Sequence, residues 1–217
     1  PHTSLVILLF KFFRICNVKL IVRQPNILSK SLNGTFQLKL IRILYKNLIN
    51  YADIIIVTSE YMKKEIIKYV KERKKIVLLK NPICIKSTRR KILPKRIKGN
   101  GLRIVFVGRL VHQKGIDRIL PLLRNIKDIK LLLIGEGKKY DELVFLVKKL
   151  GLQNKVIFKG YIKSPYDYIA GADYLILPSR WEGLPNVVLE SLVLGTPVIT
   201  FKDIKALNDY KDSIKKA

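Results

Sequence analysis

With 217 residues, the chain is long enough for one large or two small domains that each bury a core. Its 48% hydrophobic and 27% charged residues exclude an intrinsically disordered chain. The formal net charge of +27 excludes an evenly balanced surface and attracts polyanions, meaning nucleic acid or the anionic face of a membrane.

About half of the excess positive charge lies in one stretch of the chain. Residues 62–98 hold fifteen Lys and Arg residues and two Glu residues. Docking to an anionic membrane surface and a composition bias that selects nothing are equally compatible with this stretch. Nucleic acid is the weaker candidate, because no helix-turn-helix, zinc-finger or aromatic RNA-binding signature accompanies the charge.

The apolar run at residues 4–10 predicts a buried or interfacial helix. Lys11 and Arg14 interrupt it well before the roughly 20 residues that span a bilayer. No secretory signal is visible, and Cys16 and Cys84 follow no pattern, which is consistent with reduced thiols in a cytosol. We therefore expect a cytoplasmic protein, located at the inner face of the cytoplasmic membrane if the basic stretch docks there.

The first part of the chain alternates short apolar runs with amphipathic stretches, as in a parallel sheet covered by helices. The pattern predicts strands at residues 19–23, 53–58 and 76–79 and helices at residues 38–51 and 60–70. Ser59 occupies the N-cap position of the second helix. The basic stretch 87–101, which contains Pro94 and two glycines, predicts an exposed linker. We therefore expect one domain at residues 1–98 and another at 99–217.

The second part of the chain has a more regular pattern. It predicts helices at residues 115–125, 138–150, 165–170 and 186–194, between strands at residues 103–107, 130–134, 155–159, 173–177 and 197–201. The last of these strands closes the predicted series. Five strands with helices between them predict an open α/β sheet, in which ligands bind outside the carboxyl ends of the strands.

The loop after the first of these strands carries two permanent cations. Arg109 and Lys114 flank a turn that leads from Gly108 into the helix predicted to begin near Gly115. A helix N-terminus favours anions because its free N–H groups and dipole point outward, so this loop suits a diphosphate. In so basic a chain, a Lys near an Arg is also expected by chance. His112 in the same loop is interpreted as a solvated residue.

The loops after the next two strands give weaker candidates. Gly135 and Gly137 are explained by a tight turn, with ligand contact by the intervening Glu136 as the weaker interpretation. Tyr161, which follows Gly160, either packs against a base or is an aromatic residue on the rim of the site.

The loop after the strand at 173–177 places two carboxylates around a helix start. Glu182 lies in the loop and Glu190 about one turn inside the predicted helix, while Gly183 allows close backbone approach and Pro185 favours a helix start. Carboxylates accept hydrogen bonds from vicinal hydroxyls, so the pair suits a sugar and a ribose. The alternative is that both are solvated surface charges.

Taken in order, these motifs resemble the donor-binding domain of retaining GT-B glycosyltransferases of family 4, the glycosyl transferases group 1, and in particular bacterial envelope-polysaccharide members. The resemblance covers about residues 102–199, and residues 54–64 resemble the end of the family's first domain. The matching residues are Gly108-Arg109, Lys114-Gly115, Gly160, Ala172-Asp173-Tyr174, Pro178-Ser179, Glu182-Gly183, Pro185, Glu190 and Gly195-Thr196-Pro197-Val198-Ile199.

The resemblance implies two Rossmann-like domains, an acceptor-side domain at 1–98 and a domain at 99–217 that binds a nucleotide-sugar donor. That donor, expected to be UDP-linked, is a substrate, and no cofactor is expected. Arg109 and Lys114 would neutralise its diphosphate as the leaving group. Glu182 would position the transferred sugar together with the backbone N–H groups of Gly183 and Leu184, and Glu190 would bind the ribose hydroxyls.

The resemblance further implies metal-independent transfer of a hexose-type sugar, with retention, to a polysaccharide, lipopolysaccharide or lipid-linked acceptor. The absence of an Asp-x-Asp motif from the chain fits this metal independence.

The chain also departs from the family pattern. The family's Gly-rich opening does not precede Pro1 and its later units do not follow Phe201, so we expect a fragment with a truncated N-terminal domain and an incomplete C-terminal end. Arg23 stands where the family tends to place a His, and it either faces the cleft or is a structural surface residue. The alternatives are a truncated, non-catalytic nucleotide-sugar-binding remnant and, less favoured, a basic nucleic-acid-binding protein.

Overall fold

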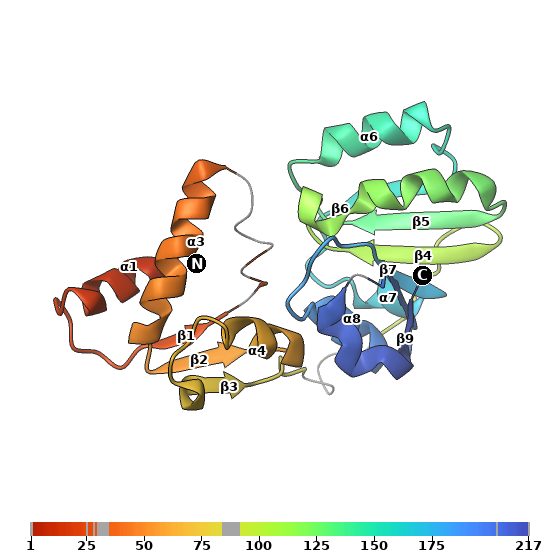
Figure 1. Cartoon of the computed structure of the whole chain (residues 1–217). Coiled ribbons are helices and arrows are strands. Elements are labelled where there is room, and N and C mark those ends of the chain that lie inside the picture. The colour runs from red at the N-terminus through yellow and green to blue at the C-terminus, as the bar shows by residue number, and fades with distance from the viewer. Residues whose placement is uncertain are drawn as a thin grey trace. The chain divides into compact units, whose positions relative to one another are not determined.

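The structure, a computed structural model, describes residues 2–24, 26–27, 29, 35–83, 92–202 and 204–216. It divides into two compact units (Figure 1). The first unit comprises Pro1–Asn81, Trp181–Leu184 and Lys205–Asp209, and the second comprises Pro82–Arg180, Pro185–Ile204 and Tyr210–Ala217. The boundary expected at residues 98 and 99, with its acceptor-side and donor-side roles, stays a prediction. Cys84 and residues 87–91 of the expected linker lie outside the described residues.

The first unit is built on a parallel sheet with the strand order β1-β2-β3 (Figure 1). Its strands are β1 (Ile21–Arg23), β2 (Ile54–Val57) and β3 (Ile76–Leu78). Its helices are α1 (His2–Phe12), α3 (Phe36–Leu48) and α4 (Glu60–Ile66), and 3-10 turns at Ile49–Tyr51 and Arg73–Lys75 lead into β2 and β3. The predicted N-cap of α4 is present, because Ser59 Oγ accepts a hydrogen bond from the Met62 backbone N–H at 3.3 Å.

The core of the first unit lies under one face of this sheet. Val22 and Ile55 are buried there, while their strand neighbours Ile21 and Ile54 are exposed, as expected where successive side chains point to opposite faces. Leu8 of α1, Tyr45 of α3 and Met62 of α4 belong to the same core. The apolar run at residues 4–10 therefore does form a helix with a buried side. None of the helices in the described ranges has both the length and the apolarity that crossing a bilayer requires.

The second unit is built on a larger parallel sheet with the order β6-β5-β4-β7-β8-β9 (Figure 1). Ile104, Val105 and Phe106 in the central strand are all buried, as expected for a strand covered on both faces. The helix α8 packs against β7 and β8. The element bounds are β4 (Leu102–Val107), β5 (Ile129–Ile134), β6 (Val156–Gly160), β7 (Tyr174–Leu177), β8 (Val198–Thr200), β9 (Ile214–Lys216), α6 (Tyr140–Lys149), α7 (Tyr166–Ala170) and α8 (Asn186–Val193).

Two predictions about the second unit are wrong. The α-helix predicted at residues 115–125 is a succession of 3-10 turns at His112–Lys114, Ile116–Arg118 and Leu120–Asn125. Pro121 accounts for part of this difference, because it has no N–H to donate and disfavours α-helical dihedrals in the residue before it. The predicted series also ended one strand too early, since β9 pairs with β8 in parallel.

Candidate functional site

The strand order of the second unit defines a place where ligands bind in open α/β sheets. From β4 the chain continues to β5 and β6 on one side, and then returns to β7 on the other side of β4. The connection after β4 therefore runs toward β5 and the connection after β7 runs toward β8 on the opposite side, although both begin at the carboxyl ends of neighbouring strands. Ligands of doubly wound sheets bind at such a switch point, outside the carboxyl ends of the strands.

A pocket of about 370 Å³ lies at the carboxyl ends of β4, β5 and β6. The predicted site residues Gly108, Arg109 and Tyr161 all line it, so the structure brings these three together. Tyr161 is 71% exposed, which leaves its ring available to a ligand. Glu136 also lines the pocket, and its Oε1 accepts a hydrogen bond from the Tyr161 backbone N–H at 3.4 Å. Glu136 therefore lies at the candidate site, and its contact with a ligand stays the weaker prediction.

Two glycines allow the floor of this pocket to be compact. A Cβ on Gly135, which has a φ of 135°, would lie 2.0 Å from the Gly108 carbonyl oxygen. A Cβ on Gly108 would lie 3.2 Å from the Phe106 ring and 3.5 Å from Lys114 Cε. The Lys114 side chain thus passes beside Gly108, next to the pocket that contains Arg109. The structure places both predicted cations at the end of β4.

The turns that carry Lys114 are fixed by contacts with the loop after β7. Arg180 forms a bidentate ion pair with Asp117, with nitrogen–oxygen distances of 2.8 and 2.5 Å. Arg180 also donates from Nη1 to the His112 carbonyl at 2.9 Å and from its backbone N–H to the Gln113 carbonyl at 2.8 Å. Arg180 therefore holds the residues on both sides of Lys114.

Arg118 ties the same two loops together a second time. Its Nη1 donates to the carbonyls of Pro178 and Ser179 at 3.2 and 3.0 Å, and its guanidinium lies 3.9 Å from the Phe201 ring centroid. Gly115, with a φ of 64°, fits between them because an added Cβ would lie 2.3 Å from the Pro178 carbonyl oxygen. Sequence reasoning missed Asp117, Arg118 and Arg180, because no motif links residues more than 60 positions apart.

The ion pair between Arg180 and Asp117 keeps both side chains in their charged forms. The Arg180 guanidinium lowers the pKa of the Asp117 carboxyl, chiefly through their hydrogen bonds, and Asp117 raises the pKa of Arg180 in the same way. The pair stays ionised at neutral pH and is internally compensated. The wrong prediction of an α-helix at 115–125 also removes the helix-dipole argument for anion binding, so the attraction for a diphosphate rests on Arg109 and Lys114 themselves.

Glu190 lies half-buried on α8, in the same unit. Burial raises the pKa of its carboxyl, because an apolar environment penalises the charged form. Tyr166 on α7 is its neighbour: burial, and secondarily the charge of Glu190, raise the pKa of the Tyr166 hydroxyl. Sequence reasoning did not select Tyr166, whose approach to Glu190 depends on the packing of α7 against α8.

The remaining predicted residues belong to the first unit. Glu182 is only 5% exposed, so its interpretation as a solvated surface charge is wrong, and Gly183 and Leu184 follow it in the same buried segment. Asn81 Nδ2 donates to the Leu184 carbonyl at 2.9 Å, and Arg23 Nη2 donates to Asn81 Oδ1 at 2.7 Å. Asn81, which sequence reasoning did not select, therefore links two predicted site residues.

The described residues contain no group of three or more His, Cys, Asp or Glu side chains that would hold a metal ion. The predicted site residues are cations and hydrogen-bonding groups instead: Arg109 and Lys114 suit a diphosphate, and carboxylates such as Glu190, which is not among the residues lining the pocket, suit hydroxyls. Metal independence stays a prediction.

Comparison with known proteins gives relatives along most of the chain. A protein of Methanocaldococcus jannaschii named as an uncharacterized glycosyltransferase is 33% identical over 207 residues, which are 90% of this chain and 51% of that protein. The N-acetylgalactosamine-N,N'-diacetylbacillosaminyl-diphospho-undecaprenol 4-alpha-N-acetylgalactosaminyltransferase of Campylobacter jejuni is 30% identical over 174 residues, or 79% of this chain and 46% of that enzyme. The chain thus spans about half the length of these two curated relatives.

Among solved structures, the Anabaena protein HepE in complex with UDP and glucose matches with a TM-score of 0.77 at 20% identity, covering 95% of this chain and 59% of that one. This likeness shows the fold, and the predicted fold class, α/β with parallel sheets of the GT-B type, is confirmed. Residues 88–211, more than half of the chain, match the family Glycosyl transferases group 1. The chain therefore belongs to the glycosyl transferases group 1.

Proposed function

We propose that the protein is a retaining glycosyltransferase of family 4 and that its second unit binds a nucleotide-diphosphate sugar, expected to be UDP-linked. The observation that carries the proposal is the pocket lined by Gly108, Arg109 and Tyr161 at the carboxyl ends of β4, β5 and β6. Its position beside the switch point between β4 and β7 is where a doubly wound sheet binds a nucleotide. The Anabaena neighbour with UDP and glucose shares this fold, which supports the same ligand class here.

Arg109 and Lys114 act on the diphosphate in this proposal. As the bond between the sugar and the diphosphate breaks, negative charge develops on the departing UDP. Two cations that are already in place stabilise that charge more in the transition state than in the bound donor, which is what accelerates a reaction. The contacts of Arg180 on both sides of Lys114 supply the required rigidity. The proposed mechanism therefore needs no divalent cation.

The carboxylates and Tyr161 recognise the rest of the donor. The Glu190 carboxylate accepts hydrogen bonds from the ribose hydroxyls, and Tyr161 packs against the base. Glu182, buried in the loop between β7 and α8, positions the transferred hexose together with the backbone N–H groups of Gly183 and Leu184. We assign no protein nucleophile, so retention requires the acceptor hydroxyl to attack the anomeric carbon from the same face that the departing diphosphate occupied.

The proposed acceptor is a surface polysaccharide, a lipopolysaccharide or a lipid-linked glycan. The name of the Campylobacter jejuni relative specifies a sugar carried on diphospho-undecaprenol, which supports a lipid-linked acceptor. We place the reaction in the cytoplasm at the inner face of the membrane, because the basic stretch at residues 62–98 would be attracted to anionic lipids there.

Titration of the full chain with UDP in a calorimeter, together with a thermal-shift screen of nucleotide diphosphates, tests this proposal. We expect UDP to bind and to raise the melting temperature, and UMP to bind more weakly because it lacks the second phosphate. Stronger binding of another nucleoside diphosphate would show that the donor carries that base instead of uracil. Failure of all nucleoside diphosphates to bind would contradict the proposed function.

A further inference from the structure

A second pocket, of about 620 Å³, lies in the first unit. Two of its lysines, Lys68 and Lys71, belong to the basic stretch at residues 62–98, so its assignment to a lipid rests on the membrane location in the proposed function. The pocket is formed by the end of α3, the turn that leads into β2, and the segment before β3. This is the amino-terminal edge of the β1-β2-β3 sheet, whereas Arg23 is the last residue of β1 and Asn81 follows the carboxyl end of β3. The lining residues are Lys46, Asn47, Asn50, Tyr51, Lys68, Tyr69, Lys71 and Glu72.

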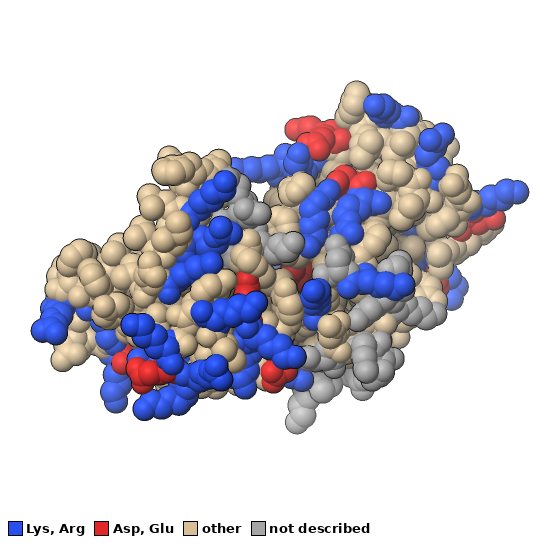
Figure 2. Space-filling model, in the orientation of Figure 1, with Lys and Arg blue, Asp and Glu red and all other residues tan. Residues whose placement is uncertain are grey.

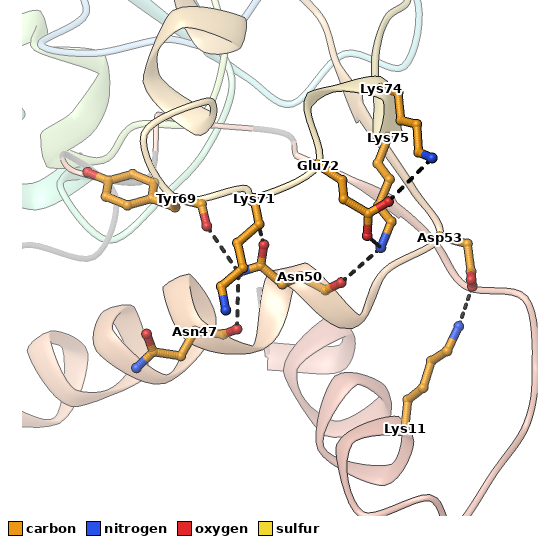
Figure 3. A network of polar contacts seen from close by, with 9 residues as sticks. All are labelled: Lys11, Asn47, Asn50, Asp53, Tyr69, Lys71, Glu72, Lys74 and Lys75. Atoms are coloured by element: carbon orange, nitrogen blue, oxygen red, sulfur yellow. Dashed lines mark hydrogen bonds and ion pairs between the residues drawn. The ribbon is translucent and has the colours of Figure 1, made fainter.

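Asn50 holds the walls of this pocket in place (Figure 3). Its Nδ2 donates to the Tyr69 carbonyl at 3.0 Å and its Oδ1 accepts from the Lys71 backbone N–H at 2.8 Å. Its own carbonyl accepts from Lys75 Nζ at 3.3 Å. A single side chain and its backbone thus join the turn at Ile49–Tyr51 to the segment at residues 69–75, so hydrogen bonds within the folded unit hold the pocket in shape.

The charge inside this pocket is positive. Its one acidic residue, Glu72, already pairs with Lys75 at 2.8 Å and with Lys74 at 3.8 Å, and the Lys75 hydrogen bond lowers its pKa (Figure 3). Within the part of the chain that the structure describes, none of the other three charged lining residues has an acidic partner; these are Lys46, Lys68 and Lys71. On the face shown in Figure 2, Lys and Arg side chains gather over the region of β2 and β3.

Composition bias explains many lysines but not this arrangement. Lys46 lies in the last turn of α3, where a cation is favourable, and its Nζ is 4.1 Å from the Tyr69 ring centroid. Lys68 and Lys71 have no such local role, and both are exposed at the rim of the same pocket. Like charges repel, and an anion bound among these lysines would offset that repulsion.

We infer that the pocket lined by Lys46, Asn50, Lys68 and Lys71 binds a phosphate-bearing group. Lysine ammonium groups suit phosphate as compact point charges, and the pocket offers amide and hydroxyl groups from Asn47, Tyr51 and Tyr69 for the remaining oxygens. A phosphate with two negative charges would be contacted by several cations at once. The site is independent of the proposed donor pocket, which belongs to the other unit.

The apolar side chains next to the pocket favour a lipid headgroup as the source of that phosphate. Phe12 at the end of α1 contacts Tyr51 of the pocket, with ring centroids 5.2 Å apart, and Phe13 contacts Phe12 at 4.9 Å. Phe12 and Phe13 are 43% and 64% exposed. The ion pair between Lys11 and Asp53 fixes the end of α1 at this place (Figure 3). Exposed aromatic side chains beside a cationic pocket suit the boundary between phosphate and acyl chains.

Titration of ¹⁵N-labelled full chain with inorganic phosphate, in the presence of excess UDP, tests the pocket. We expect the backbone amide resonances of Asn50, Lys71 and Glu72 to shift, and the double variant Lys68→Gln/Lys71→Gln to bind at least tenfold more weakly. The matched control is Lys39→Gln/Lys64→Gln, which removes the same charge from exposed positions outside the pocket and should stay within twofold of the unaltered chain. Equal weakening in both variants, or shifts confined to other residues, would overturn the inference.

Vesicle sedimentation distinguishes the two sources of phosphate. Phosphatidylglycerol vesicles, but not phosphatidylcholine vesicles, should sediment the unaltered chain, and Lys68→Gln/Lys71→Gln and Phe12→Ser/Phe13→Ser should each reduce sedimentation at least fivefold. Phosphate shifts at the pocket without vesicle binding would assign the site to a soluble phosphate ester. Because the comparison is between lysine variants, its result does not depend on whether UDP binds the other unit.

Discussion

Arg180 and Asp117, 63 residues apart in the chain, form a bidentate ion pair with distances of 2.8 and 2.5 Å. The pair joins the loop after β7 to the turns after β4, on either side of the strand-order switch. Arg180 also contacts the carbonyls of His112 and Gln113, so it positions Lys114 without contacting the donor pocket itself. The site is therefore assembled by a contact between two loops and not within either one.

Replacement of Arg180 should weaken UDP binding while it lowers the free energy of unfolding only slightly. We expect Arg180→Gln to lower the free energy of unfolding by about 1 kcal/mol, since the pair is partly exposed. UDP affinity should fall about fivefold, because the backbone on both sides of Lys114 loses its anchor. Urea denaturation and calorimetry measure the two effects. If UDP affinity were unchanged while stability fell, Arg180 would have only a structural role.

Acidification should remove the contribution of this ion pair. The folded-state pKa of Asp117 is below its ordinary value. The ion pair therefore contributes its full stabilisation at pH values above the ordinary pKa, and this contribution is lost as the pH falls through the folded-state pKa. We therefore expect Asp117→Asn to lose less stability than the unaltered chain between about pH 4 and pH 2. Urea denaturation across this range checks the slope. Parallel curves for the two proteins would contradict the assigned shift.

Lys114 is the cation whose removal should weaken the nucleotide most directly. We expect Lys114→Ala to bind UDP more than tenfold more weakly, because a charge-assisted contact to phosphate is worth about 1.5–3 kcal/mol. The matched control is Lys148→Ala, an exposed position on α6 outside the pocket, which should bind as the unaltered chain does. Calorimetry that shows the same affinity for both variants would remove Lys114 from the diphosphate role.

Substitution of Glu190 should affect UDP affinity and protein stability in different ways. Its carboxylate is half-buried and burial raises its pKa, so the charged form costs stability at neutral pH. We expect Glu190→Gln to keep or raise the melting temperature while UDP affinity falls about tenfold, since a neutral amide is a weaker acceptor for ribose hydroxyls. Glu142→Gln on α6 is the exposed control. A lower melting temperature with unchanged UDP affinity would assign Glu190 to packing.

Gly135 should be intolerant of any side chain. Both Gly135 and Gly151 have positive φ, but a Cβ on Gly151 meets nothing within 4 Å, whereas one on Gly135 lies 2.0 Å from the Gly108 carbonyl oxygen. We expect Gly151→Ala to cost about 1–2 kcal/mol from backbone strain alone. Gly135→Ala should cost roughly 1–3 kcal/mol more and distort the donor pocket. If urea denaturation gave the same loss in the free energy of unfolding for both variants, the contact with the Gly108 carbonyl oxygen would not contribute to the cost.

The elements that a local pattern encodes were predictable from the sequence. Alternating and continuous apolar runs identified β2, β4 and β5 to within one or two residues. Burial of one face of a strand requires apolar residues at alternate positions, and burial of both faces requires them at consecutive positions. Ser59 was likewise identifiable as an N-cap, since its partner is Met62, three residues away. Pro121 was a visible signal against the α-helix at residues 115–125, and the apolar periodicity of that segment was given too much weight.

What the tertiary structure decided is which loops lie next to one another. The order β6-β5-β4-β7-β8-β9 brings the residues after β4 and β7 together, and only this contact reveals the roles of Asp117, Arg118 and Arg180. The short strand β9 likewise exists through its pairing with β8. Strand order and loop contacts depend on free energies summed over residues far apart in the chain. Residue types and short spacings therefore supplied the candidate residues, whose chemistry stays a prediction, while the contacts that bring their loops together required the fold.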